Sequence, residues 1–154
     1  MTHPTTRQAL LTMLGRHGTL PVVVFDVDEF VLFVSHAGAA VGESALAALA
    51  ELFENRAARS NGYVHPIEPD RFLVALPANR YDEAVAFAER SVDAVRALDI
   101  PFPGARSVCA PRLSVTAAVV SVDSRADIER FDVRVNDLLR DGKSTGGDTI
   151  VRDR

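Results

Sequence analysis

The stretch from residue 20 to residue 28 reads Leu-Pro-Val-Val-Val-Phe-Asp-Val-Asp, an apolar run that ends abruptly in acidic residues. A continuous apolar run of this length is typical of a strand that is buried on both faces of a sheet. Carboxylates that follow such a strand lie at its end, beside residues of the neighbouring strands. The stretch therefore predicts a central strand with Asp26 and Asp28 at its end.

Periodicity on either side of this strand predicts the remaining elements. We expect helices over residues 5–18, 42–59, 81–98 and 124–140, and strands over residues 62–67, 72–76, 113–122 and 149–151. Ser124 is placed to cap the last helix. The chain has 154 residues, the usual size of one domain, and we divide it into an N-terminal helix and lead-in (1–19) and a main domain (20–154).

The central order β-α-β-β-α-β is the split unit of ferredoxin-like folds. It predicts an α/β protein of the α+β kind: a ferredoxin-like palm with a mostly antiparallel central sheet flanked by helices. Right-handed crossovers place the first strand beside the third, antiparallel to it. Asp26 and Asp28 then approach Asp70, and three carboxylates at one sheet edge are able to chelate Mg²⁺ in the way used for nucleotidyl transfer.

Charge and cysteine content exclude several classes of function. The chain has 17 basic and 21 acidic residues and a net charge of −4, which disfavours nucleic-acid binding. One cysteine, Cys109, suits a reducing cytoplasm, and we expect a packed or loop residue there rather than a nucleophile. We find no secretory signal and no apolar run long enough to span a bilayer, so we expect a cytoplasmic protein without a membrane partner.

Several motifs carry a family resemblance. Residues 26–30, Asp-Val-Asp-Glu-Phe, match a strand followed by Asp-x-Asp-x-Phe, and Gly38 and Gly42 follow. Residues 68–72 read Glu-Pro-Asp-Arg-Phe where that family has Gly-Gly-Asp/Glu-Glu-Phe, and Lys143, the only lysine, stands three residues before a glycine. The chain resembles the GGDEF domain, the diguanylate cyclase family, over residues 20–152, and this resemblance implies a palm of the nucleotide-cyclase type.

The resemblance implies the positions of a site. Three groups would hold Mg²⁺, namely Asp26, the carbonyl of Val27, and Asp70. Four residues would lie at a bound nucleotide, namely Phe30, Glu43, Arg71 and Lys143, with Lys143 reaching a phosphate as a point charge. The implied ligand is GTP or a cyclic dinucleotide.

Departures from the family pattern fall on the same site. Arg71 stands where the family has an acid, and Glu68 and Pro69 replace the two glycines that let the backbone approach the nucleotide. Val34 stands where an asparagine reads guanine, and residues 59–62 lack the acid of the product-inhibition motif Arg-x-x-Asp. We therefore assign no catalytic residue and predict that cyclisation has been lost.

These observations favour a degenerate GGDEF domain of bacterial cyclic-dinucleotide signalling, a non-enzymatic regulatory or nucleotide-binding protein that works with a second copy or a separate protein. Two alternatives stay open: an active nucleotidyl cyclase with an altered substrate, and a scaffold without a ligand. For Arg71 we favour a structural salt bridge with Asp70 or Glu68 over a contact with a nucleotide phosphate.

Two other interpretations of the aspartate pair are less well supported. Haloacid-dehalogenase phosphatases open with Asp-x-Asp-x-Thr/Val, but position 30 is phenylalanine. Alternatively, Asp26 and Asp28 serve only to cap a loop at the end of the strand.

Overall fold

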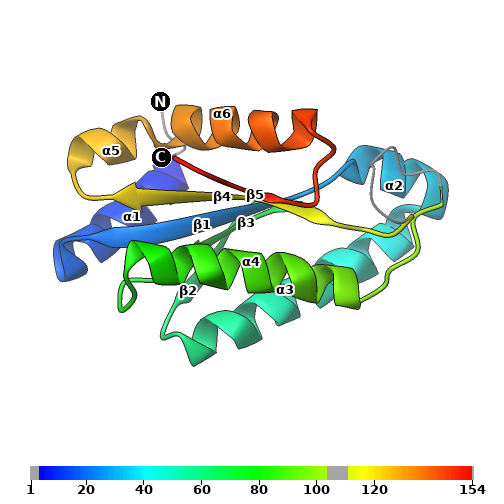
Figure 1. Cartoon of the computed structure of the whole chain (residues 1–154), viewed down its shortest axis with the longest axis horizontal. Coiled ribbons are helices and arrows are strands. Elements are labelled where there is room, and N and C mark those ends of the chain that lie inside the picture. The colour runs from blue at the N-terminus through cyan, green and yellow to red at the C-terminus, as the bar shows by residue number, and fades with distance from the viewer. Residues whose placement is uncertain (1–3, 104–110, 154) are drawn as a thin grey trace.

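The computed structural model describes residues 4–103 and 111–153, and Cys109 lies outside this part of the chain. Its elements are α1 (Pro4–His17), β1 (Leu20–Val27), α2 (Phe30–Ala37), α3 (Ala39–Arg59), β2 (Tyr63–Glu68), β3 (Arg71–Ala75), α4 (Tyr81–Ala97), β4 (Val115–Val122), α5 (Arg125–Glu129), α6 (Phe131–Ser144) and β5 (Ile150–Arg152). Figure 1 shows them as one sheet with helices on both faces.

The strand order in the sheet is β2-β3-β1-β4-β5. The first strand lies between β3 and β4 and is antiparallel to both, while β5 is parallel to β4. This confirms the predicted palm, including the antiparallel pairing of the first and third strands. In the register of β1 and β3, Phe25 is opposite Phe72 and Asp26 is opposite Arg71.

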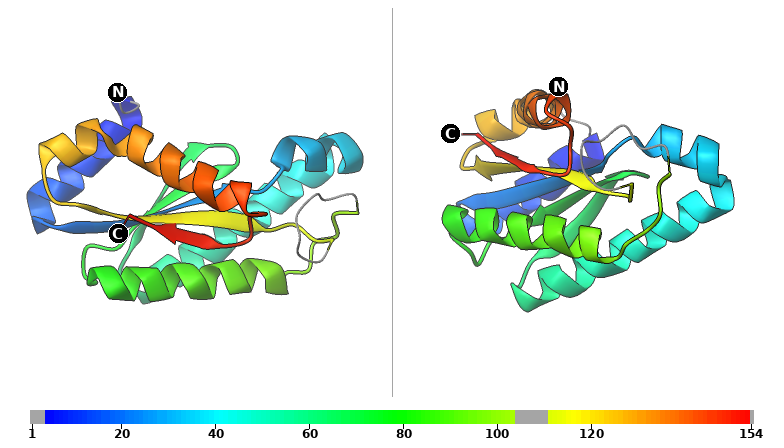
Figure 2. Two further views of the ribbon diagram at one scale, coloured as in Figure 1. Left: turned by 45° about the horizontal axis from the view of Figure 1, so that its top comes forward. Right: turned by 45° about the vertical axis from the view of Figure 1, so that its right-hand side comes forward.

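Alternation along β1 decides which face each side chain meets, because successive strand residues point to opposite faces. Val23 and Phe25 belong to the core beneath α3 and α4, whereas Val22 and Val24 belong to the core beneath α1, α5 and α6. Figure 2 shows these two helical layers on either side of the sheet. Asp26 alternates in step with Val22 and Val24, so its side chain lies on the same face of the sheet, the face that α6 covers.

Besides small shifts at the ends of elements, the structure differs from the sequence prediction in two regions. Residues 30–37 form α2, an additional helix in which only Phe33 is buried, so it lacks the apolar stripe by which periodicity identifies a helix. Gly38, with φ of 96°, separates α2 from α3. The predicted helix over 124–140 divides at Arg130 into α5 and α6, and Ser124 caps α5 by accepting from the backbone N–H of Asp127 at 3.2 Å.

Among the described helices, none combines the length and the apolar character that a membrane crossing requires.

Candidate functional site

The carboxylate of Asp26 lies between two cations. Its Oδ2 accepts a hydrogen bond from Nε of Arg71 at 2.7 Å, and its Oδ1 is 3.1 Å from Nζ of Lys143. The Asp26 side chain is 12% exposed, so both ion pairs are largely shielded from water. Arg71 also donates from Nη1 to Oδ1 of Asn136 on α6 at 2.8 Å. The first acid of the Asp-x-Asp-x-Phe motif is thus neutralised by the chain itself.

Lys143 reaches this position from the last turn of α6. Besides Asp26, its ammonium group contacts Oδ1 of Asp28 at 3.0 Å and the carbonyl oxygen of Val27 at 3.3 Å. An ammonium group has three N–H donors, and here each faces an oxygen of the end of β1. The group that the family resemblance assigns to a phosphate is therefore bound to protein oxygens.

Asp28 is held by hydrogen bonds to the sheet. Its Oδ1 accepts from Oγ1 of Thr116 at 2.6 Å, and its Oδ2 accepts from Oγ of Ser114 at 2.7 Å and from the backbone N–H of Asp148 at 2.8 Å. Gly147, with φ of 72°, brings its backbone so close that an added Cβ would lie 2.7 Å from Cγ of Asp28. Asp28 therefore joins β1 to β4 and to the turn before β5, and does not serve with Asp70 as a pair of chelating carboxylates.

Asp70 lies in the turn between β2 and β3. Its carbonyl oxygen accepts from the N–H of Val27 at 3.0 Å, which fixes the turn against the end of β1. Burial raises the pKa of the Asp70 carboxyl, and the negative charge of Asp26 raises it further. The turn that carries Asp70 thus lies against the end of β1, beside Asp26, because β1 and β3 are paired strands.

Arg71 forms a structural ion pair, but with a different partner from the one expected. We predicted Asp70 or Glu68, whereas the guanidinium binds Asp26 on the neighbouring strand. The reason is strand alternation: Arg71 is directly opposite Asp26 and points to the same face, toward α6.

Phe30 and Glu43 lie on α2 and α3 rather than at the Asp26 cluster. Glu43 is exposed and follows Gly42, whose missing side chain leaves room for Val34 and Phe30. A Cβ at Gly42 would lie 2.8 Å from Cγ2 of Val34 and 3.4 Å from Cζ of Phe30. Apolar side chains thus pack where the family resemblance implies a residue that reads guanine.

The site does not fit Mg²⁺ in this arrangement. Two of the three predicted ligands, Asp26 and the carbonyl of Val27, already face the ammonium group of Lys143. Within residues 4–103 and 111–153, no three His, Cys, Asp or Glu side chains form a group that could hold a metal ion. Of the seven predicted site residues, the structure brings together five. Ion pairs and hydrogen bonds join Asp26, Val27, Arg71 and Lys143, and the backbone carbonyl of Asp70 accepts from the N–H of Val27.

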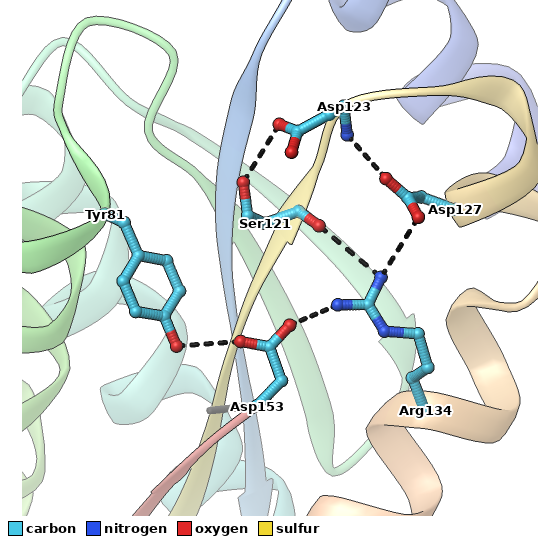
Figure 3. A pocket seen from close by; sticks show the side chains of 6 residues that line it. All are labelled: Tyr81, Ser121, Asp123, Asp127, Arg134 and Asp153. Atoms are coloured by element: carbon cyan, nitrogen blue, oxygen red, sulfur yellow. Dashed lines mark hydrogen bonds and ion pairs between the residues drawn. The ribbon is translucent and has the colours of Figure 1, made fainter.

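A second polar site lies at the other end of β4, and the sequence did not point to it. A cavity of about 460 Å³ is lined by Tyr81, Ser121, Asp123, Asp127, Arg134 and Asp153, which come from separate elements (Figure 3). Asp153 joins its two sides, since it accepts from the hydroxyl of Tyr81 at 2.9 Å and pairs with Arg134. Burial and the hydrogen bond to Asp153 raise the pKa of Tyr81 to about 12.

Known structures share this fold at low sequence identity. The active GGEEF domain of a diguanylate cyclase from Vibrio cholerae has a TM-score of 0.72 and 20% identity, over 97% of this chain and 92% of that one. The structure of the coiled coil and GGDEF domain of DgcB from Caulobacter crescentus, in complex with c-di-GMP, has a TM-score of 0.77 and 15% identity. The match covers 97% of this chain and 77% of that one. Diguanylate cyclase SiaD from Pseudomonas aeruginosa, in complex with its activator SiaC, has a TM-score of 0.76 and 22% identity; the match covers 99% of this chain but only 61% of SiaD.

No curated protein matches the sequence. The family model described as "Diguanylate cyclase, GGDEF domain" matches residues 3–149, nearly the whole chain. With the Asp-x-Asp-x-Phe strand end, the hairpin at residues 68–72 and the palm topology in place, the chain belongs to the GGDEF domain family.

Proposed function

We propose that this GGDEF domain does not cyclise GTP and acts as a non-enzymatic regulatory component of cyclic di-GMP signalling. The observation that carries the proposal is the ion pair between Nε of Arg71 and Oδ2 of Asp26, at 2.7 Å. The family resemblance assigns Asp26 to a metal ion and position 71 to an acid. An arginine at position 71 removes that acid and also occupies the carboxylate of Asp26.

The hairpin adds a second obstacle to GTP turnover. Glu68 is exposed at the end of β2, and places a negative charge where the family pattern places a triphosphate. Two unit charges about 4 Å apart repel by about 4 kcal/mol at the dielectric constant of a protein surface. Pro69 lacks the N–H that a glycine offers to a ligand and restricts φ.

Cyclisation is tested directly by incubating the purified chain with GTP and either Mg²⁺ or Mn²⁺ and measuring cyclic di-GMP by chromatography. The active GGEEF domain from Vibrio cholerae is the positive control. We expect no product above the enzyme-free background. Formation of cyclic di-GMP that Asp26→Asn abolishes would show an active cyclase and refute the proposal, and a product from another nucleoside triphosphate would support the altered-substrate alternative.

A non-enzymatic domain must act through binding. DgcB is seen with c-di-GMP and SiaD with an activator protein, and we propose that this chain regulates by binding a nucleotide or a protein in the cytoplasm, as a homodimer or with a separate protein. Calorimetry with GTP and cyclic di-GMP separates the two modes. Saturable binding that Glu43→Ala weakens assigns a nucleotide to the predicted residues, whereas no heat with either ligand favours the protein partner.

A further inference from the structure

We infer that Lys143 is the resident cation of this site: its ammonium group takes the place of a divalent metal ion and joins α6 to β1. The inference concerns the site of the proposed function and rests on the proposed loss of cyclase chemistry there. It assigns to the only lysine of the chain a role different from the phosphate contact that the family pattern implies.

The coordination of the ammonium group is the first argument. Oxygens of three consecutive residues surround Nζ, namely Oδ1 of Asp26 at 3.1 Å, the carbonyl of Val27 at 3.3 Å and Oδ1 of Asp28 at 3.0 Å. These distances are those of hydrogen bonds to a charged donor. A compact cation with three donors is thus matched by three acceptors on one strand end.

The charge balance is the second argument. Asp26 and Asp28 carry two negative charges, with side chains 12% and 7% exposed, and Lys143 and Arg71 supply two positive charges. Each of these two mostly buried carboxylates is therefore paired with a cation of the chain itself, and Asp70 in the neighbouring turn adds a third carboxyl group whose charge interacts with that of Asp26. A divalent cation bound to these oxygens would have to displace the ammonium group of Lys143 or the guanidinium group of Arg71, which would then lose its carboxylate partners.

The position of Lys143 in the fold allows its ammonium group to attach α6 to the sheet. It lies in the last turn of α6, one residue after Gly142, which packs so closely on the sheet that a Cβ would lie 2.6 Å from Cγ2 of Thr116. Lys143 and Arg71 both contact Asp26, and Arg71 also binds Asn136 of α6. The residues of the predicted metal site thus hold α6 against the sheet.

The inference predicts that divalent cations neither bind to the wild-type chain nor change its Tm. It also predicts that removal of the ammonium group creates a site for a divalent cation. We would measure the Tm of the wild type and of Lys143→Met with EDTA, Mg²⁺ or Mn²⁺, and bound Mn²⁺ by electron paramagnetic resonance. Methionine keeps most of the aliphatic stem and removes the charge. Arg140→Met is the matched control: Arg140 also lies on α6, and its side chain is 72% exposed and pairs with the exposed Asp137.

We expect the wild type to bind no Mn²⁺ and to keep the same Tm in all three conditions. Lys143→Met is expected to lose stability relative to Arg140→Met, to regain Tm when Mg²⁺ or Mn²⁺ is added, and to lose that gain in the double variant with Asp26→Asn. Mn²⁺ binding to the wild type that Asp26→Asn abolishes would overturn the inference. A Lys143→Met variant no less stable than Arg140→Met, or one that metal does not restore, would also overturn it.

The wild-type titration and its Asp26→Asn control do not depend on Lys143→Met, so the inference remains testable if Lys143→Met fails to fold. The outcome is also separable from the proposed function. Mn²⁺ binding at Asp26 without cyclic di-GMP formation would refute the resident cation and leave the non-enzymatic proposal standing.

Discussion

At the scale of single residues, Asp28 shows how a motif residue acquires a structural role. Its carboxylate is nearly buried and accepts from two hydroxyls, a backbone N–H and the ammonium group of Lys143. Removing one partner from a buried charged network leaves the others without compensation.

We expect Asp28→Ala to lower the free energy of unfolding by about 3 kcal/mol, measured by urea denaturation. Asp137→Ala is the matched control, because its carboxylate is 60% exposed and pairs with the exposed Arg140, so a change of about 0.5 kcal/mol or less is expected. Equal effects of the two substitutions would contradict the structural role of Asp28.

Asp70 provides a second residue-scale prediction, on pH. Burial and the charge of Asp26 raise the pKa of its carboxyl, so the folded chain disfavours the ionised form. This penalty applies at neutral pH and disappears as the pH falls through the raised pKa. We expect Asp70→Asn to raise Tm by about 1 °C at pH 7 and to have no effect below about pH 3, where aspartate is protonated in both states. A decrease of Tm at pH 7 in differential scanning calorimetry would contradict this.

The raised pKa of Tyr81 predicts that the folded chain loses stability at alkaline pH. Its pKa is raised from 10.0 to about 12 by burial and by the hydrogen bond to Asp153, so the folded chain holds the phenol proton more tightly than the unfolded chain. This contribution is complete below about pH 10 and is lost as the pH rises toward 12.

The Tyr81 prediction is measured on Tyr63→Phe, in which Tyr81 is the only remaining tyrosine, by following ultraviolet absorbance during a pH titration. We expect a midpoint near 12, moved to lower pH by Asp153→Asn. A midpoint that Asp153→Asn leaves unchanged would show that the hydrogen bond does not contribute.

At the scale of elements, the contact of α6 with the sheet depends on a glycine. A Cβ at Gly142 would lie 2.6 Å from Cγ2 of Thr116 and 2.9 Å from Cγ2 of Val151. We expect Gly142→Ala to destabilise the fold by about 1–3 kcal/mol through overpacking. Gly15→Ala in α1 is the control: nothing lies within 4 Å of its Cβ position, so alanine is expected to stabilise by about 0.5–1 kcal/mol in urea denaturation. The same sign for both would contradict the packing argument.

Elements with regular periodicity could be predicted from the sequence, and α2 could not. In α4, apolar residues recur at helical spacing and seven of its residues are buried, so its pattern marks both the helix and its core face. In α2, apolar residues are nearly continuous and only Phe33 is buried. A nearly continuous apolar run does not mark one face of a helix, so periodicity could not identify α2.

At the scale of the whole molecule, departures from the family pattern act on separate parts of the site. Arg71 neutralises Asp26, Glu68 adds a negative charge at the hairpin, and Val34 packs against Gly42. Because these changes lie on β3, β2 and α2, reversal of one leaves the others in place.

We therefore expect Arg71→Glu, which restores an acid, to produce no cyclic di-GMP from GTP and Mg²⁺ by chromatography. Thermal unfolding checks that the variant is folded, and a folded variant with cyclase activity would show that a single substitution at position 71 is sufficient for activity, against this expectation.

The sequence by itself determined the palm topology and the family. The order of elements and the apolar run at residues 20–25 restrict the pairing of strands, because crossovers are right-handed and buried strands lie centrally. Only the tertiary structure decided what the site residues do. Lys143 and Asp28 are 115 positions apart in the chain, and Arg71 has Asp70 and Glu68 closer in sequence than Asp26. Which acid each cation meets depends on strand register and on the face to which a side chain points, and these are set by packing of the whole sheet against α6.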